Sequence, residues 1–154
     1  MAGKIKMAII GCGGIAHCHA RAAAQAGVRL QAICEVSAEA LERFGDQYGV
    51  EGRYLSLEEM LAREELDIAV ISTWGVYHAQ TSNLLAQSRR VRAILCEKPI
   101  CSTAAECAGM IEVANKSGVL LAEAFKFRHH PQHLKARELI DAGDRKSTRL
   151  NSSH

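Results

Sequence analysis

Residues 7–17 read Met-Ala-Ile-Ile-Gly-Cys-Gly-Gly-Ile-Ala-His, and this stretch decides the fold. The apolar run that ends at Ile10 predicts a buried strand, and the glycine after it allows a tight turn. The spacing Gly11-x-Gly13-x-x-Ala16 matches the fingerprint of a dinucleotide-binding turn, with alanine in the third position. We therefore predict that a pyrophosphate binds where the next helix begins, because the free N–H groups and the helix dipole favour an anion there.

Glycine-rich turns are common, so the residues around this fingerprint decide whether it indicates dinucleotide binding. A helical pattern over residues 16–26 ends at Gly27, and a second apolar run over residues 28–34 ends in Glu35. Glu35 lies 24 residues after Gly11 (35 − 11), close to the roughly 20 expected for a carboxylate that binds the adenosine ribose. The alternative, a purely structural turn, explains the glycines but not the acid.

The rest of the chain alternates between strand-like and helix-like segments. We expect strands at residues 4–10, 28–34, 53–55, 67–73, 91–96 and 119–122. We expect helices at about residues 15–26, after Ser37, from Ser56, at about 77–87, after Thr103, and from Pro131 to Ala142. This alternation predicts an α/β fold, a doubly wound parallel sheet with helices on both faces. Ligands of such sheets bind beyond the carboxyl ends of the strands, where Gly11, Glu35, Thr73 and Lys98 all fall.

Composition limits the possible partners. The chain has 154 residues, 48% of them hydrophobic, which is enough for one domain with a core. Its net charge of +2 comes from residues 144–154, which hold three basic residues and one acid, so residues 1–143 are neutral. This balance gives no electrostatic reason to expect nucleic acid or a membrane surface as partner. The N-terminus has no apolar signal segment, and we expect a cytoplasmic protein.

The cysteines and histidines do not form a metal-binding pattern. The six cysteines contain no C-x-x-C pair, and we expect reduced, mostly buried thiols. His129, His130 and His133 have no carboxylate or cysteine nearby to complete a ligand set, so we predict no metal site. We expect His17 and His19 at surface or helix-start positions, on different faces of the first helix.

Lys98 is the strongest candidate for a catalytic residue. It follows a buried strand, between Glu97 and Pro99, and the proline fixes the local backbone. At the end of that strand a lysine can reach a nicotinamide, its ribose or a substrate hydroxyl, and can act as acid or base. The alternative is a lysine that is simply solvated.

Three motifs in order give this sequence a family resemblance. They are Gly-Cys-Gly-Gly-Ile-Ala-His-Cys-His-Ala from Gly11, Ile-Ser-Thr with Tyr77-His78-Ala79, and Leu-Cys-Glu-Lys-Pro-Ile at 95–100. Together they resemble the nucleotide-binding half of the Gfo/Idh/MocA oxidoreductases, the family of glucose–fructose oxidoreductase and inositol dehydrogenase. Residues 123–132 are similar to the segment where that family enters its second domain. The resemblance covers residues 4–143.

The resemblance implies an NAD(P)-dependent dehydrogenase with a Rossmann fold that acts on a sugar, polyol or related alcohol. Site roles then follow for the matching residues. The pyrophosphate would be held by Gly11, Gly13, Gly14 and Ile15, Cys12 would also contact the cofactor, and Glu35 would bind the adenosine ribose. The path to the nicotinamide would be lined by Thr73, Trp74 and His78. Glu97 and Lys98 would contact the cofactor at its reacting end, with Lys98 catalytic and also binding substrate, and Arg128 would contact substrate near the mouth of the site.

Two departures from the family pattern matter. Trp74 stands where the family usually has proline, so the loop after Thr73 has a different shape, although an aromatic ring there could stack on the cofactor. The second departure is that the substrate-binding, oligomerising α/β domain expected after Gly143 is missing. We therefore expect an N-terminal fragment with weak or no turnover, taken from a parent protein that forms homo-oligomers through the missing domain.

The resemblance also predicts domain boundaries. Residues 1–122 would form the NAD(P)-binding domain, and residues 123–143 would begin the substrate domain. Residues 144–154 contain one apolar residue, Leu150, and resemble translated sequencing-adapter read-through, so we interpret them as a non-native tail. The alternative is a short disordered native tail.

Cofactor choice and reaction class leave alternatives open. Glu35 favours NAD, because a carboxylate repels a 2′-phosphate, whereas Ser37 and Arg43 leave NADP possible. The main function prediction is hydride transfer. The alternatives are an NAD-dependent glycoside hydrolase and a non-catalytic dinucleotide-binding domain.

Overall fold

The computed structural model describes residues 5–143, and the prediction for the tail at 144–154 falls outside that range. The chain forms two compact units, which divide between Ala124 and Phe125. The first unit holds the whole sheet, and the second is a short helical segment.

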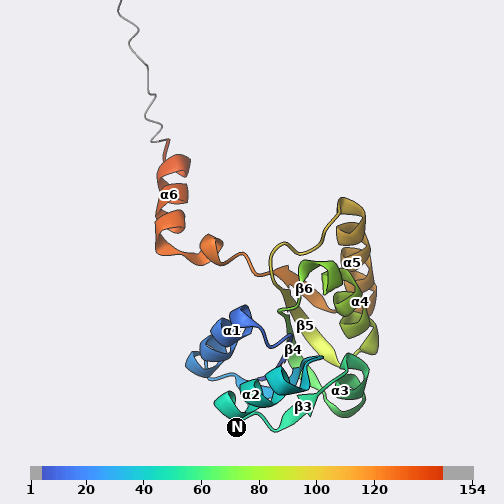
Figure 1. Cartoon of the computed structure of the whole chain (residues 1–154). Coiled ribbons are helices and arrows are strands. Elements are labelled where there is room, and N and C mark those ends of the chain that lie inside the picture. The colour runs from blue at the N-terminus through green and yellow to red at the C-terminus, as the bar shows by residue number, and fades with distance from the viewer. Residues whose placement is uncertain (1–4, 144–154) are drawn as a thin grey trace, which may run out of the picture. The chain divides into compact units, whose positions relative to one another are not determined.

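Six parallel strands form one sheet in the order β3-β2-β1-β4-β5-β6 (Figure 1). The strands are β1 (Lys6–Ile10), β2 (Arg29–Cys34), β3 (Gly52–Tyr54), β4 (Leu66–Ile71), β5 (Val91–Cys96) and β6 (Leu120–Glu123). From β1 the chain adds strands first on one side and then, from β4, on the other. This order is the doubly wound Rossmann arrangement, and the fold prediction is confirmed.

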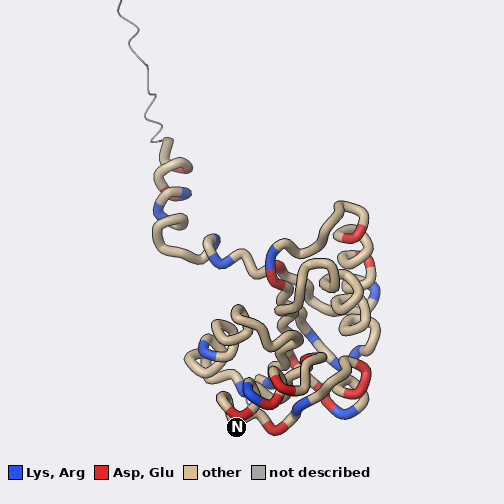
Figure 2. The backbone as a smooth tube through the Cα atoms, in the orientation of Figure 1, with Lys and Arg blue, Asp and Glu red and all other residues tan. Residues whose placement is uncertain are grey.

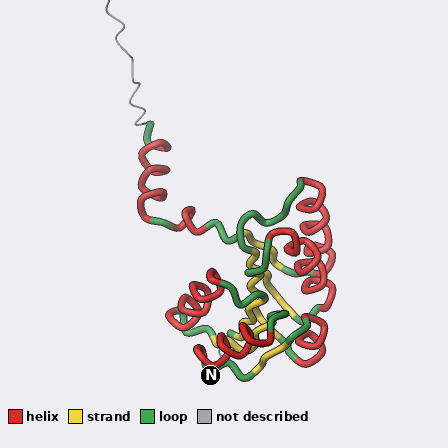
Figure 3. The backbone as a smooth tube through the Cα atoms, in the orientation of Figure 1, coloured by secondary structure: helices red, strands yellow, loops and turns green. Residues whose placement is uncertain are grey.

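Helices cover both faces of the sheet (Figure 3). They are α1 (Gly14–Gln25), α2 (Ala38–Tyr48), α3 (Leu57–Arg63), the 3-10 turn η1 (Gly75–Tyr77), α4 (His78–Ser88) and α5 (Ala104–Ser117). One core contains Ile9 and Phe44 and joins the sheet to α1 and α2. The other contains Ile94 and Met110 and joins the opposite face to α3, α4 and α5. Continuous apolar strands such as β4 are what burial on both faces requires.

Side-chain caps start three of the six described α-helices at the predicted residues. The Ser37 side chain accepts a hydrogen bond from the Ala40 N–H, and the Ser56 side chain accepts one from the Glu59 N–H. Thr103 forms the complete capping box predicted at the start of α5, and Gly118 ends that helix in the left-handed conformation. These caps satisfy N–H groups that a helix leaves unpaired in its first turn.

The strands end level with one another at their carboxyl ends. Ile10 of β1 pairs with both Cys34 and Ile71, Ile71 pairs with Cys96, and Cys96 pairs with Glu123. The ladder continues by one residue at all four of these pairs. The N–H groups donate from Gly11 to the Cys34 carbonyl (2.8 Å), from Ser72 to Ile10 (2.8 Å), from Glu97 to Ile71 (3.0 Å) and from Ala124 to Cys96 (2.7 Å). The loops predicted to carry the site therefore leave the sheet from one row.

The second unit contains the 3-10 turn η2 (Lys126–His129) and α6 (Pro131–Asp141). Pro131 is the first residue of α6, as predicted, and the rings of Phe125 and Phe127 pack edge to face with centroids 5.0 Å apart. Acidic and basic residues are interspersed along the elements of the chain (Figure 2). Among the described helices, none combines the length and the apolar character that a membrane crossing needs.

Candidate functional site

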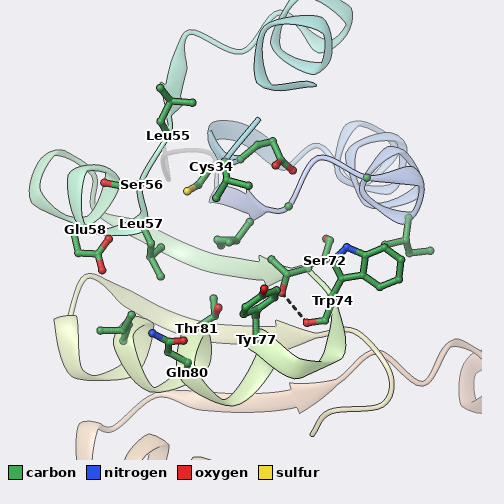
Figure 4. A pocket seen from close by; sticks show the side chains of 18 of the residues that line it. Cys34, Leu55, Ser56, Leu57, Glu58, Ser72, Trp74, Tyr77, Gln80 and Thr81 are labelled. Atoms are coloured by element: carbon green, nitrogen blue, oxygen red, sulfur yellow. Dashed lines mark hydrogen bonds between the residues drawn. The ribbon is translucent and has the colours of Figure 1, made fainter. Parts of the chain in front are cut away.

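A cavity of about 760 Å³ opens at the carboxyl ends of β1, β2 and β4 (Figure 4). Its walls come from the glycine turn, the end of β2, the start of α3, the loop after β4 and one side of α4. The lining residues are Ile10, Gly11, Gly13, Gly14, Ile15, Cys34, Glu35, Val36, Leu55, Ser56, Leu57, Glu58, Ser72, Thr73, Trp74, Tyr77, Gln80, Thr81 and Leu84. The cavity lies where the strand order changes direction, which is the usual ligand position in an open α/β sheet.

Gly11 must be glycine because of the backbone around it. Its φ is +91°, and an added Cβ would lie 2.9 Å from the carbonyl group of Ser72 and from the nitrogen of Thr73. A side chain would therefore collide with the main chain of the neighbouring strand end, in a conformation that L-residues rarely adopt. This glycine brings the turn after β1 against the turn after β4.

Gly13 and Gly14 are different, because the chain itself leaves space around them. A Cβ added at either position meets no atom within 4 Å, and both residues line the cavity. Gly13 is the N-cap of α1 and supplies no side-chain hydrogen bond, and no acid lies in the first turn. The first N–H groups of α1 thus open onto free space without a side-chain cap, an arrangement that suits a bound pyrophosphate.

Glu35 is held rigidly beside the glycine turn. Its Oε2 accepts a hydrogen bond from the Cys12 N–H (2.9 Å), and its Oε1 accepts one from the Ser37 N–H (3.0 Å). Each carboxylate oxygen has a second lone pair, so both can still accept a bond from a ribose hydroxyl. Cys12 itself is buried and does not line the cavity, and its N–H is already bonded to Glu35.

The turn after β4 forms the opposite wall. The Ser72 hydroxyl oxygen is buried and has no hydrogen-bond partner among the described residues. The Thr73 hydroxyl donates a long hydrogen bond of 3.5 Å to the Trp74 carbonyl (Figure 4). Trp74 is 82% exposed and is the single tryptophan of the chain. This wall therefore contains a buried hydroxyl without a partner and an exposed aromatic ring.

The thiols near the cavity are protonated at neutral pH. Burial, with help from the nearby Glu35 carboxylate, raises the pKa of Cys12 to about 12 and that of Cys34 to about 11. Burial likewise raises the pKa of Cys96, at the end of β5, to about 12. These cysteines are free, as predicted, and pack as small apolar residues rather than as nucleophiles.

The charge of the cavity is entirely negative among the residues that line it. Glu35 and Glu58 are its charged side chains, and the lining contains no lysine or arginine. A ligand group with negative charge therefore finds main-chain N–H groups at the glycine turn and no cation elsewhere in the wall. Across residues 5–143, no group of three or more His, Cys, Asp or Glu side chains is arranged to hold a metal ion.

Besides Cys12, three more predicted site residues lie near this edge without lining the cavity. Lys98 is exposed on the loop after β5, and its peptide bond to Pro99 is cis. Glu97 is buried, and its carboxylate accepts bonds from His19 (2.9 Å) and from the Lys98 N–H (3.2 Å). His78 is 1% exposed, and its ring contacts two main-chain carbonyls.

Arg128, the predicted substrate contact, belongs to η2 in the second unit and is exposed there. Its role stays a prediction.

Sequence reasoning missed part of the cavity wall. Leu55, Ser56, Leu57 and Glu58 come from the loop after β3 and the start of α3, and Gln80, Thr81 and Leu84 come from one side of α4. The available signal was the alternation of strands and helices, since every loop that follows a strand must emerge at this edge. No comparable pattern in the sequence predicted that the buried Glu97 would be the partner of His19.

Comparisons with known proteins agree with this geometry. The family model described as "Oxidoreductase family, NAD-binding Rossmann fold" (Gfo/Idh/MocA) matches residues 5–125. A D-apiose dehydrogenase from Paraburkholderia graminis is 32% identical over 129 residues, which cover 83% of this chain and 34% of that protein.

Solved structures agree as well. The WlbA dehydrogenase from Bordetella pertussis, in complex with NADH and UDP-GlcNAcA, matches with a TM-score of 0.85 and 26% identity, covering 92% of this chain and 44% of that one. A 3-ketoreductase from Actinomadura kijaniata, in complex with TDP-benzene and NADP, matches with a TM-score of 0.81 and 27% identity over the same shares of the two chains.

The chain spans less than half the length of each of these relatives. Its family model covers the sheet and its helices, and the loops at the sheet edge carry the glycine turn and the acid after β2. The chain therefore belongs to the Gfo/Idh/MocA oxidoreductase family, whose NAD-binding Rossmann domain it carries.

Proposed function

We propose that this chain is the cofactor-binding half of an NAD(P)-dependent dehydrogenase that transfers a hydride between a nicotinamide and a sugar, polyol or related alcohol. The observation that carries the proposal is the cavity, in which an uncapped helix start and a fixed carboxylate line one open volume. The sugar-like substrate is supported by the relatives, one named a D-apiose dehydrogenase and one crystallised with UDP-GlcNAcA.

The adenosine half of the cofactor is assigned to the side of the cavity near β2 and β3. The N–H groups of Gly13, Gly14 and Ile15 would hold the pyrophosphate, and Glu35 would accept bonds from the ribose hydroxyls. Gly11 would act indirectly, because it sets the turn. Cys12 would act in the same way, through its N–H bond to Glu35.

The nicotinamide half is assigned to the side near β4 and β5. Thr73 and Trp74 line the cavity there, and the exposed indole is available to stack on a flat ring. The nicotinamide, when bound, supplies the hydride chemistry. Lys98 leaves the sheet two strands from Gly11, about 10 Å away at ordinary strand spacing, and would bind the substrate hydroxyl and assist the transfer of its proton.

NAD is the preferred cofactor in this proposal, with NADP possible. A 2′-phosphate would lie beside Glu35 in a cavity whose other charged side chain, Glu58, is also acidic. Because the lining contains no cation, the 2′-phosphate would give up its hydration and be repelled by these two carboxylates. This reasoning favours the cofactor whose ribose carries a hydroxyl.

We further propose that the whole protein is cytoplasmic and forms homo-oligomers through a separate substrate domain. The alternative reactions have less support. The relatives described above are named dehydrogenases and a reductase, which favours hydride transfer over glycoside hydrolysis. A non-catalytic role would be favoured if, in the full-length protein, a Lys98→Ala substitution left the rate unchanged.

Trp74 provides the test, because the chain has no other tryptophan. Titration with NADH is expected to quench Trp74 emission and to excite NADH emission by energy transfer, with NAD competing. The Trp74→Phe chain should lose this signal yet still release heat on binding in calorimetry. A wild-type chain that shows neither an optical change nor heat with NADH and NADPH overturns the proposal.

A further inference from the structure

The loop that carries Lys98, residues 97–100, is held by side chains from three other elements. From α1, His19 Nε2 contacts Glu97 Oε1 at 2.9 Å. From α4, His78 Nδ1 contacts the Pro99 carbonyl at 2.9 Å. From β6, the Glu123 carboxylate accepts a bond of 2.9 Å from the Ile100 N–H. A loop of four residues thus has three long-range side-chain anchors.

His78 connects this loop to the cavity wall. Its Nε2 contacts the Thr73 carbonyl at 3.1 Å, while its Nδ1 contacts Pro99. The ring is 1% exposed and does not line the cavity, so it has no surface to offer a ligand. Both partners are carbonyl oxygens, and a neutral imidazole has one N–H, so the ring donates to one of them at a time and lies against the other. One buried ring therefore lies between the turn after β4, which forms the wall, and the turn after β5, which carries Lys98.

Glu97 makes the corresponding connection to α1. It is 5% exposed, and its two oxygens are bonded to His19 and to the N–H of Lys98. A buried carboxylate needs such partners, because an unpaired charge away from water is strongly destabilising. Helix α1 also presents the uncapped N–H groups of the glycine turn, so this pair links the two ends of the proposed site.

We propose that His19, Glu97 and His78 are positioning residues that hold Lys98 against the nicotinamide end of the site, rather than residues that contact the cofactor. This inference rests on the proposed function of Lys98, and it replaces direct cofactor contact as the role of Glu97 and His78. We call the contacts that His19, Glu97 and His78 make with this loop the clamp. Loss of a clamp contact frees the loop after β5, while the adenosine half of the site, on the other side of β1, keeps its own contacts.

Matched substitutions of His78 separate the two contacts of its ring. Asparagine places an N–H₂ group near the position of Nδ1 and keeps the bond to Pro99, whereas glutamine places one near Nε2 and keeps the bond to Thr73. Amide exchange at Lys98 and Ile100 reports loop opening, with the buried strand amide of Ile9 as the reference for global stability. His78→Ala and His78→Gln are expected to speed exchange of the loop amides about fivefold or more, and His78→Asn less than about twofold.

The same logic applies to α1. His19→Ala should speed exchange of the loop amides. His19→Gln retains a donor near Nε2 and should largely restore their wild-type exchange rates. Tyr48→Phe is the matched control, because it removes the hydroxyl that contacts His17 Nδ1 (2.9 Å) on a different face of the same helix. The control should leave exchange of the loop amides unchanged.

Ligand binding is the second readout. In the clamp variants NADH affinity should fall about fivefold or more, while affinity for ADP, which lacks the nicotinamide, should stay within about twofold of wild type. Equal effects of asparagine and glutamine at position 78, or loop exchange unchanged by His78→Ala and His19→Ala, overturn the inference. If the wild-type chain does not bind NADH, the proposed function fails, and the exchange measurements still decide whether the clamp exists.

Discussion

Substituting alanine in turn for Gly11, Gly13 and Gly14 separates what the fold requires from what a ligand requires. At Gly11 the new Cβ would lie 2.9 Å from backbone atoms of Ser72 and Thr73, at a φ of +91°. The left-handed conformation costs an L-residue about 1–2 kcal/mol, and forcing atoms into a packed site costs about 1–3 kcal/mol more. Gly11→Ala should therefore lower the free energy of unfolding by about 2–5 kcal/mol.

The other two glycines provide the matched controls. A Cβ at Gly13 or Gly14 meets nothing within 4 Å. Alanine at the N-cap position 13 should cost at most about 1 kcal/mol, and alanine at position 14 should be neutral or stabilise α1 by up to about 1 kcal/mol. The fold has no steric reason to keep glycine at either position.

Urea unfolding followed by circular dichroism measures the three free energies, and calorimetry with NADH measures binding. Gly13→Ala should fold normally yet bind NADH at least about tenfold more weakly, because its methyl group occupies the space a pyrophosphate would approach. The reasoning is refuted if Gly11→Ala is as stable as wild type, or if Gly13→Ala binds NADH with unchanged affinity.

Three further predictions concern the ribose acid, the thiols and a helix cap. Glu35→Gln should weaken NAD binding about tenfold and raise the NADP-to-NAD affinity ratio; an unchanged ratio in competition titrations would show that Glu35 does not select the cofactor. Burial raises the pKa of Cys12 and Cys96 to about 12 and of Cys34 to about 11, above the ordinary 9.0, so these thiols stabilise the fold fully below pH 9. That stability is lost as the pH rises from about 9 to about 12 for Cys12 and Cys96 and to about 11 for Cys34, by about 1.4 kcal/mol per thiol at pH 10. Urea midpoints that do not fall between pH 8.5 and 10 would contradict this prediction. Thr103→Ala removes the capping box of α5 and should cost about 1 kcal/mol without changing NADH affinity, which calorimetry on the same sample checks.

Local sequence patterns predicted the fold well, because each element has its own signal. The alternation of apolar runs and helical periods gave the parallel sheet, and β5 has the predicted bounds of residues 91–96. Caps at Ser37 and Thr103 placed two helix starts. The glycine fingerprint placed the turn after β1, since the collision that excludes a side chain at Gly11 arises from backbone geometry common to such turns.

The candidate site was harder to predict, because neighbours at a sheet edge are far apart in the chain. Sequence reasoning grouped Glu97 and His78 with the cofactor contacts from their motifs alone. The structure shows both buried, with Glu97 bonded to His19 across 78 residues and His78 bonded to Pro99 across 21. Burial and hydrogen-bond partners of this kind depend on how α1 and α4 each pack against the loop after β5, which no local pattern encodes.

The histidines of α1 illustrate the same limit. His17 and His19 were expected on different faces near the helix start, and both lie in the first half of α1 with different partners. His17 packs against Phe44 and Tyr48 of α2, whereas His19 pairs with Glu97. The spacing of the two histidines predicted that they lie on different faces of α1. Which residue each ring contacts depends on how α2 and the loop after β5 pack around that helix.

The most direct test of the central claim, that the edge between β1 and β4 binds a dinucleotide, is an amide NMR titration of the chain with NAD. We expect the largest shift changes at Gly13, Gly14 and Ile15, with the Cys12 amide following through its bond to Glu35. No shift change at saturating NAD and NADP, or changes confined to residues away from the glycine turn, would contradict the account.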